Sequence, residues 1–259
     1  MGLTYQSAGR SVARALFNIK MNDHEPVIAL AGNPNTGKST VFNSLTGLRQ
    51  HTGNWPGKTV LRAEGILIHK GLKYKLIDLP GTYSLLANSA DEEVARDFIC
   101  FGKPDATVVV VDATCLERNL NLVLQVMEIT DKVIVCVNLI DEARRKKIEI
   151  DIDKLSEKLG LPVIATAARS GEGFHRLVDT IGDVARGRLT PKPKPVRYTR
   201  EVEEAVARLE PTVRNVIGGE ASARWVALRL LDGDTKLVQA MEKFFGAREM
   251  VSVMREVLA

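Results

Sequence analysis

The chain has 259 residues, of which 45% are hydrophobic and 26% are charged, as in a globular protein of one large or two modest domains. No run approaches the roughly 20 apolar residues that cross a membrane. The net charge of +4 is small for this length and does not imply a nucleic-acid partner. Cys100, Cys115 and Cys136 show no C-x-x-C spacing, which is typical of reduced thiols in a cytosolic compartment. We therefore expect a soluble protein that binds no nucleic acid.

The first segment, residues 1–25, is a basic N-terminal extension. Arg10, Arg14 and Lys20 accompany apolar residues, with no acidic residue before Asp23. The segment fits a short amphipathic helix that touches an anionic surface, a transit sequence, or an extension packed loosely on the domain. The sequence leaves these alternatives open.

From Pro26 onward, short β-rich runs alternate with helical patterns. Five runs predict strands: 27–31, 73–77, 107–111, 133–137 and 162–165. Residues 65–69 and 72–77, joined by Lys70-Gly71, predict an antiparallel edge hairpin. Ser89 and Glu92 form a capping-box pattern that begins a helix through Phe101. The pattern predicts an α/β domain, residues 26–189, with a mostly parallel sheet flanked by helices.

The segment 190–195 contains three alternating prolines, which cannot continue a helix and favour an extended spacer. Beyond it, apolar residues follow helical spacing in 202–209, 225–231, 237–245 and 250–258, with no strand alternation. The sequence therefore predicts a second, all-helical domain over residues 190–259.

The most informative motif is G-x-x-x-x-G-K-[ST], placed between a predicted strand and a predicted helix. Backbone N–H groups of such a loop surround phosphate oxygens, Lys38 supplies a positive charge, and the Ser39 hydroxyl can bind Mg²⁺. The nucleotide-binding residues expected here are Gly32, Asn33, Pro34, Asn35, Thr36, Gly37, Lys38, Ser39 and Thr40.

A second motif, D-x-x-G, ends the strand predicted at 73–77 and consists of Asp78, Leu79, Pro80 and Gly81. This edge of an open α/β sheet is where ligands bind. We expect Asp78 to hold Mg²⁺ through water and the Gly81 N–H to meet a γ-phosphate.

A third motif, N-x-x-D, follows the strand predicted at 133–137 and consists of Asn138, Leu139, Ile140 and Asp141. A carboxylate can accept hydrogen bonds from the N1–H and 2-amino groups of guanine, and adenine offers neither donor there. Asp141 therefore predicts a preference for GTP over ATP. A base-contacting loop of Thr166, Ala167 and Ala168, followed by Arg169, is expected after the next strand.

These four elements, in this order, resemble the G domains of translation-factor-like small GTPases. Within that class, the motifs at 32–39, 53–59 and 78–85 resemble ferrous iron transport protein B (FeoB), with the middle motif, Gly-Asn-Trp-Pro-Gly-Lys-Thr, the most specific. The resemblance implies a GTPase whose second domain is the helical, dissociation-inhibitor-like domain of the family. It also implies that residues 53–59 form the switch I segment, called the switch segment below.

The resemblance assigns the switch segment to the nucleotide, through Gly57, Lys58 and Thr59, with Thr59 as an Mg²⁺ ligand. Thr82 stands where many small GTPases have a glutamine that orients water, so slow intrinsic hydrolysis is expected. The family includes members activated by potassium, and the resemblance implies a K⁺ site formed by Asn35 and the carbonyls of Gly53 and Trp55. The expected catalytic residues are Asn35, Lys38, Thr59 and Gly81.

Other charged residues do not predict a dedicated iron site. Acidic residues at 91–93 complement a helix dipole, and the four histidines share no ligand spacing. The basic run 144–147 fits a solvated helix end or a surface that faces a membrane.

The resemblance implies a transmembrane iron-permeation domain as partner, in the same full-length chain or in another, and a location at the cytoplasmic face of the bacterial inner membrane. Small regulatory Feo proteins and a second copy of the chain are further partners that it allows. The chain is expected to be either a truncated form or a standalone relative. An RNA-linked GTPase of ribosome assembly or tRNA modification, and a pure nucleotide switch, are the alternatives.

Overall fold

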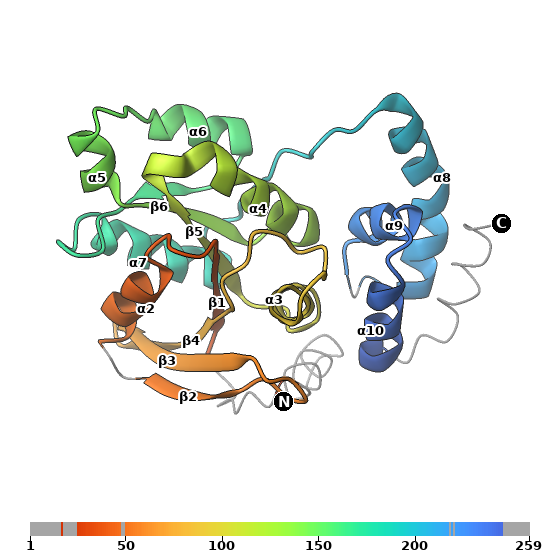
Figure 1. The fold of residues 1–259 in the computed structure, drawn as a ribbon, viewed down its shortest axis with the longest axis horizontal. Coiled ribbons are helices and arrows are strands. Elements are labelled where there is room, and N and C mark those ends of the chain that lie inside the picture. The colour runs from red at the N-terminus through yellow and green to blue at the C-terminus, as the bar shows by residue number, and fades with distance from the viewer. Residues whose placement is uncertain (1–16, 18–24, 48–49, 218, 220, 246–259) are drawn as a thin grey trace.

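A computed structural model of the chain describes residues 17, 25–47, 50–217, 219 and 221–245 (Figure 1). Apart from Phe17 and Glu25, the basic extension predicted at 1–25 lies outside these residues, as does the helical pattern at 250–258. Within the described part of the chain, no helix is long and apolar enough to cross a membrane.

The centre of the molecule is a seven-stranded mixed sheet with the order β2-β3-β4-β1-β5-β6-β7. Its strands are β1 (Val27–Gly32), β2 (Gln50–Asn54), β3 (Leu61–His69), β4 (Leu72–Asp78), β5 (Ala106–Asp112), β6 (Val133–Asn138) and β7 (Val163–Ala165). The strands from β4 through β1, β5 and β6 to β7 pair parallel with one another, whereas β2–β3 and β3–β4 pair antiparallel. The predicted parallel sheet and its antiparallel hairpin are therefore confirmed, but the hairpin does not form the edge, because β2, which was not predicted, pairs outside it.

Helices cover both faces of the sheet, because alternate residues of its buried strands point to opposite sides. The face that buries Ile28 and Leu30 packs against α2 (Lys38–Thr46) and α7 (Phe174–Ala185). Helices on the face that buries Val27 and Ala29 are α3 (Ala90–Phe101), α4 (Leu116–Ile129), α5 (Ile140–Arg145) and α6 (Ile152–Leu159); a short 3₁₀ turn, η1 (Ala113–Cys115), precedes α4.

The predicted capping signal at the start of α3 is confirmed. The Ser89 hydroxyl accepts a hydrogen bond from the Glu92 N–H at 3.2 Å, and the Glu92 carboxylate accepts one from the Asn88 N–H at 2.9 Å. Two backbone donors at the helix N-terminus are thereby satisfied. The first-turn acidic residues thus have a structural role at this helix end.

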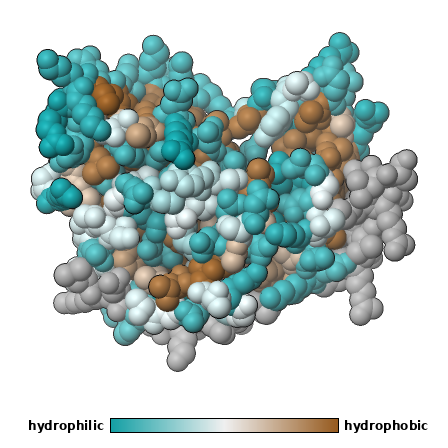
Figure 2. All heavy atoms as spheres, viewed as in Figure 1, coloured by the Kyte–Doolittle hydropathy of each residue, from teal (hydrophilic) through white to brown (hydrophobic). Residues whose placement is uncertain are grey.

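The C-terminal part is helical, as expected, and consists of α8 (Arg200–Ile217), α9 (Ala223–Leu231) and α10 (Thr235–Phe245). Its apolar residues share one core with the sheet face that carries α3 and α4, so the two parts are packed together. Figure 2 shows a notch on the upper edge of the molecule along the linker, and side chains fill the space below it.

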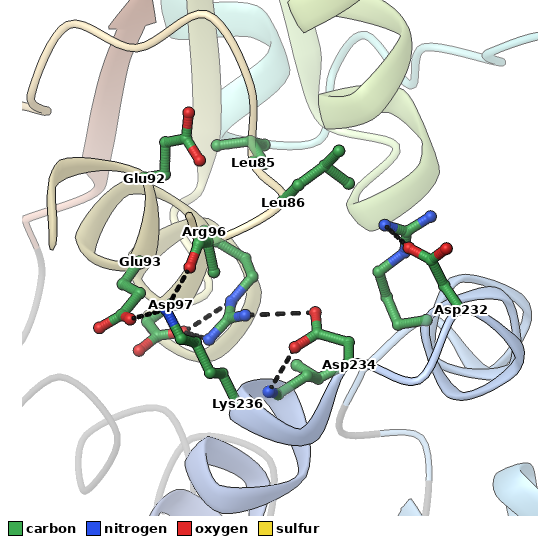
Figure 3. A network of polar contacts seen from close by, with 12 residues as sticks. Leu85, Leu86, Glu92, Glu93, Arg96, Asp97, Asp232, Asp234 and Lys236 are labelled. Carbon is green, nitrogen blue, oxygen red and sulfur yellow. Dashed lines mark hydrogen bonds and ion pairs between the residues drawn. The ribbon is translucent and has the colours of Figure 1, made fainter. Parts of the chain in front are cut away.

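A buried ion pair between the sheet domain and the C-terminal helices joins α3 to the start of α10. Arg96 is 1% exposed and contacts Asp97 at 2.8 Å and Asp234 at 3.4 Å (Figure 3). Burial raises the pKa of Asp97, and the Arg96 charge opposes that rise. Because a buried cation without its partners is strongly destabilising, this network fixes how the helical part sits on α3.

The proline-rich linker is extended, as predicted, but it is bound to the sheet domain rather than free. The N–H of Lys192 donates to the Gly160 carbonyl at 3.0 Å, and that of Lys194 donates to the Leu159 carbonyl at 2.9 Å. Gly160 has φ +71°, and a Cβ there would lie 2.1 Å from the Lys192 carbonyl oxygen. Only glycine permits this approach of the linker to the end of α6.

Candidate guanine-nucleotide site

The phosphate loop connects β1 to α2 through a backbone that needs glycine. Gly37 precedes α2 with φ 78°, and Asn35 also has a positive φ of 66°. A Cβ on Gly32 would lie 2.6 Å from the Val110 carbonyl oxygen of the neighbouring strand. The Thr36 hydroxyl closes the loop by donating to the Asn33 carbonyl at 2.9 Å. The loop therefore directs the N-terminus of α2 toward the site, as anion binding requires.

Asn138 at the end of β6 joins the phosphate loop to the predicted base-contacting loop. Its Nδ2 donates to the Thr36 carbonyl at 3.0 Å, and its Oδ1 accepts from the Ala168 N–H at 3.1 Å and from the Thr166 hydroxyl at 3.3 Å. Asn138 is fully buried. Gly37 makes room for its amide, since a Cβ there would lie 2.5 Å from Nδ2.

The next residues turn the chain toward solvent. Leu139 has φ 61° and precedes α5, while the Ile140 N–H donates to the Thr166 carbonyl at 3.1 Å. Ala167 pairs with Glu172 across an isolated antiparallel bridge, which fixes the loop from the other side. Asp141 is consequently held at the exposed first turn of α5, close to the base-contacting loop.

The D-x-x-G turn lies against the phosphate loop. Lys38 Nζ contacts Asp78 Oδ1 at 2.5 Å, and both side chains are mostly buried. Burial raises the pKa of Asp78, and the Lys38 charge opposes that rise. A Cβ on Gly81 would lie 3.5 Å from Pro34, and the Thr82 N–H donates to the Gly32 carbonyl at 3.2 Å. Leu79 is buried and Pro80 half-buried beside them.

A cavity of about 370 Å³ opens between the phosphate loop, the N-x-x-D turn and the base-contacting loop, and the D-x-x-G turn is not part of its wall. Predicted site residues in its wall are Asn35, Gly37, Thr40, Asn138, Leu139, Asp141 and Ala168. The wall also contains four residues that were not predicted: Asp112, Thr114, Glu142 and Lys146. Asp112 could have been found, because it follows an apolar strand at the same sheet edge as Asp78 and Asn138.

The switch segment does not line this cavity. Gly53 lies on β2, opposite Arg62 of β3, and Gly57, Lys58 and Thr59 are exposed in the turn between the two strands. Trp55 is 2% exposed and packs on Phe98 of α3. The structure thus brings the phosphate, D-x-x-G and base loops together, and the three switch residues predicted as metal ligands are not in the wall of the cavity.

The donor set near the phosphate loop suits hard cations. The oxygens of Ser39 and Asp78 lie on elements that the Lys38–Asp78 pair joins directly, and Mg²⁺ prefers carboxylate and hydroxyl oxygens beside substrate phosphates. Asn35 is exposed at the cavity, where its amide oxygen can face a cation. In the described residues, no three His, Cys, Asp or Glu side chains form a group that could hold a metal ion by themselves.

A glycine-rich loop between strand and helix, a D-x-x-G turn on the adjacent strand and an N-x-x-D turn after β6 together define a P-loop GTPase G domain. The family model for ferrous iron transport protein B matches residues 26–181, and that for the FeoB cytosolic helical domain matches residues 198–258. The chain belongs to the ferrous iron transport protein B (FeoB) family.

Relatives and solved structures support this assignment. The chain is 38% identical over 234 residues to the Fe(2+) transport protein A/Fe(2+) transporter FeoB fusion protein of Porphyromonas gingivalis, which covers 89% of this chain and 27% of the relative. It is 40% identical over 211 residues to the Fe(2+) transporter FeoB of Escherichia coli (strain K12), and this match covers 80% of this chain and 27% of the relative. The cytosolic domain of the T. maritima FeoB iron transporter in a GDP form matches with a TM-score of 0.76 and 35% identity, over 90% of this chain and 95% of that chain. This chain thus spans 27% of the length of these two curated relatives.

Proposed function

We propose that this chain binds and hydrolyses GTP and that its nucleotide state regulates ferrous iron transport by a membrane domain. The single observation that supports this most is the link through Asn138, which joins the phosphate loop to the base-contacting loop at one cavity. The cargo, ferrous iron, is inferred from relatives that are named as Fe(2+) transporters. The proposed domains are the G domain at 26–189 and the helical domain at 190–259.

In the proposed mechanism, backbone N–H groups of the phosphate loop and Lys38 hold the nucleotide phosphates. Lys38 would exchange its contact with Asp78 for the phosphates, and Asp78 would then hold Mg²⁺ through water, with the hydroxyls of Ser39 and Thr59 as ligands. When bound, Mg²⁺ neutralises charge on the β- and γ-phosphates. The Gly81 N–H orients the γ-phosphate, and Asp141 selects guanine.

Potassium is proposed to replace the missing charge of an arginine finger. Thr82 offers no amide to orient water, and a cation beside the phosphates would supply charge stabilisation instead. Its proposed ligands are the Asn35 amide oxygen and, once the switch segment has closed, the carbonyls of Gly53 and Trp55. This role requires the switch segment to leave its present position on α3.

We propose that the chain acts at the cytoplasmic face of the bacterial inner membrane, beside a transmembrane iron-permeation domain. A small Feo protein is a proposed partner, because one relative is a fusion of Fe(2+) transport protein A with FeoB. Association of the chain with itself remains a proposal. A pure nucleotide switch is the alternative function, and family membership gives no support to the RNA-linked alternative.

The experiment that tests the proposal is the GTP hydrolysis rate at matched ionic strength in potassium chloride and sodium chloride, with ATP as the control nucleotide. We expect hydrolysis of GTP alone and a several-fold higher rate in potassium. The Asn35→Ala variant should lose the potassium stimulation and keep its nucleotide affinity. The matched control is Asn215→Ala, an exposed asparagine on α8.

An unchanged potassium response of Asn35→Ala would reject the role of this residue. Binding of GTP without hydrolysis in either salt would favour the pure switch, and equal hydrolysis of ATP would reject guanine selection by Asp141.

A further inference from the structure

An aromatic cluster of five side chains joins the switch segment to three other parts of the chain. The cluster consists of Phe17, Trp55, Phe98, Phe101 and Phe244. Phe17 stacks on Phe244 of α10 at 5.1 Å between ring centroids and makes edge contacts with Trp55 at 6.0 Å and Phe98 at 5.3 Å. Trp55 also contacts Phe98 at 5.3 Å, and Phe101 stacks on Phe244 at 4.6 Å.

Phe17 is the residue of the basic N-terminal extension that closes this cluster, and it is 6% exposed. Arg62 of β3 fixes its backbone, because the guanidinium Nη1 donates to the Phe17 carbonyl oxygen. The same guanidinium lies 5.6 Å from the Trp55 ring centroid and forms an ion pair with Glu64 at 2.9 Å. Arg62 therefore holds Phe17 and Trp55 against one another, with the ring of Phe17 between Trp55 and the helical domain.

A second contact holds the same segment on α3. Lys58 forms an ion pair with Glu93 at 2.5 Å, and Lys236 of α10 contacts the same carboxylate at 3.0 Å. Lys236 also donates to the carbonyl of Ala87, in the segment that follows the D-x-x-G turn, at 2.8 Å. Figure 3 shows Lys236 between Glu93 and the start of α10. Glu93 thus lies at the meeting point of the switch segment and the helical domain.

The position of Trp55 decides where Thr59 can be. The Trp55 N–H donates to the Val60 carbonyl at 2.9 Å, and the Lys58 N–H donates to the Trp55 carbonyl at 3.0 Å, so residues 55–60 form one closed turn. While Trp55 remains in the aromatic cluster, this turn stays at the β2–β3 end and outside the nucleotide cavity. Binding of Thr59 near the phosphates and burial of Trp55 on α3 therefore compete.

We propose that Phe17 is a positioning residue that holds Trp55 in the aromatic cluster and so keeps the switch segment away from the nucleotide site until GTP binds. The inference rests on the proposed function, because it assigns the switch segment to the γ-phosphate. Only molecules whose switch segment has left the aromatic cluster can contact the γ-phosphate with it. The apparent dissociation constant for GTP is therefore the intrinsic one divided by the fraction of such molecules. GDP lacks the γ-phosphate and is bound independently of this equilibrium.

The test uses a Trp225→Phe background, in which Trp55 is the only tryptophan of the chain. In the absence of nucleotide, Phe17→Ala should shift the Trp55 emission to the red and increase its quenching by acrylamide. The apparent affinity for a non-hydrolysable GTP analogue should rise by up to about tenfold, while the affinity for GDP stays constant. Phe17→Tyr keeps the ring and should behave as the parent does.

The matched control is Leu155→Ala, a truncation in α6 that packs on the same core outside the aromatic cluster. It should change neither the emission nor the affinity ratio. Phe244→Ala removes the stacking partner of Phe17 and should change both in the same direction as Phe17→Ala, which provides a second variant if Phe17→Ala folds poorly.

Unchanged Trp55 emission in both variants would overturn the proposed contact, and a red shift without any gain in analogue affinity would overturn the gating role. If the parent failed to bind the GTP analogue, the proposed function and the gating role would both fail. The emission of Phe17→Ala would still decide whether Phe17 positions Trp55.

Discussion

Two regions of the molecule are built in different ways: the proposed base-binding end of the site, around Asn138 and the Thr166–Ala168 turn, and the switch segment. At the base-binding end, Asn138 is fully buried and its amide joins the phosphate loop to the Thr166–Ala168 turn by three hydrogen bonds. The switch segment instead has an exposed Thr59, and its contacts are with α3, with Arg62 of β3 and with Phe17. The first region is a preformed binding surface, whereas the second is held by contacts that compete with the position proposed for nucleotide binding.

The largest expected effect comes from removing the Asn138 amide, which lies at the centre of the proposed base-binding end. Asn138→Ala leaves the Thr36 carbonyl and the Ala168 N–H without this partner, while the Thr166 hydroxyl keeps its contact with Cys136 Sγ at 3.2 Å. We expect the free energy of unfolding to fall by about 2–4 kcal/mol. Urea denaturation measures it, with the exposed Asn215→Ala as the control, expected within about 0.5 kcal/mol of the parent. A loss no larger than that of the control would mean that Asn138 does not hold the two loops together.

The second prediction concerns a substitution that changes which base is bound and leaves the fold unchanged. Asp141→Asn removes the charge that is proposed to accept from guanine. Hydrogen bonds to a charged group contribute about 1.5–3 kcal/mol each, so the affinity for GDP should fall by about 100-fold. Xanthine carries a carbonyl in place of the 2-amino group, and an asparagine can donate to it. Titration with guanine and xanthine nucleotides checks this, with the exposed Asp153→Asn as control. Equal affinity of Asp141→Asn and the parent for GDP would contradict it.

The smallest expected effect concerns the ion pairs that hold the switch segment. The Lys58 hydrogen bond, followed by that of Lys236, holds the pKa of Glu93 below its ordinary value. A carboxylate with a lowered pKa contributes stability above its ordinary pKa of about 4.3 and loses it as the pH falls through the folded-state value. In the Trp225→Phe background, the Trp55 emission should therefore shift slightly to the red as acid is added.

The control for this titration is Glu93→Gln, which should have the shifted emission already at neutral pH and no dependence on acid in this range. An acid response of the same size in Glu93→Gln would show that another group loosens the switch segment.

Much of the site could be predicted because its residues are consecutive. The phosphate loop, D-x-x-G and N-x-x-D motifs each follow a strand of the parallel sheet, and parallel strands bring their carboxyl ends to one edge. Asp112 was missed although it has the same placement, because it belongs to no recognised motif. The position of β2 was missed for a different reason: its residues, Gln50–Asn54, have no apolar alternation, and only pairing with β3 makes them a strand.

The sequence by itself determined the class of nucleotide site and the α/β and helical parts, because glycine spacing, strand periodicity and caps act over a few residues. Only the tertiary structure decided where the switch segment lies, how Lys38 meets Asp78, and that the linker binds Gly160. It also brought Phe17, Trp55 and Phe244 together. These contacts join residues far apart in the chain, and their energies depend on burial and on partners that no local pattern contains.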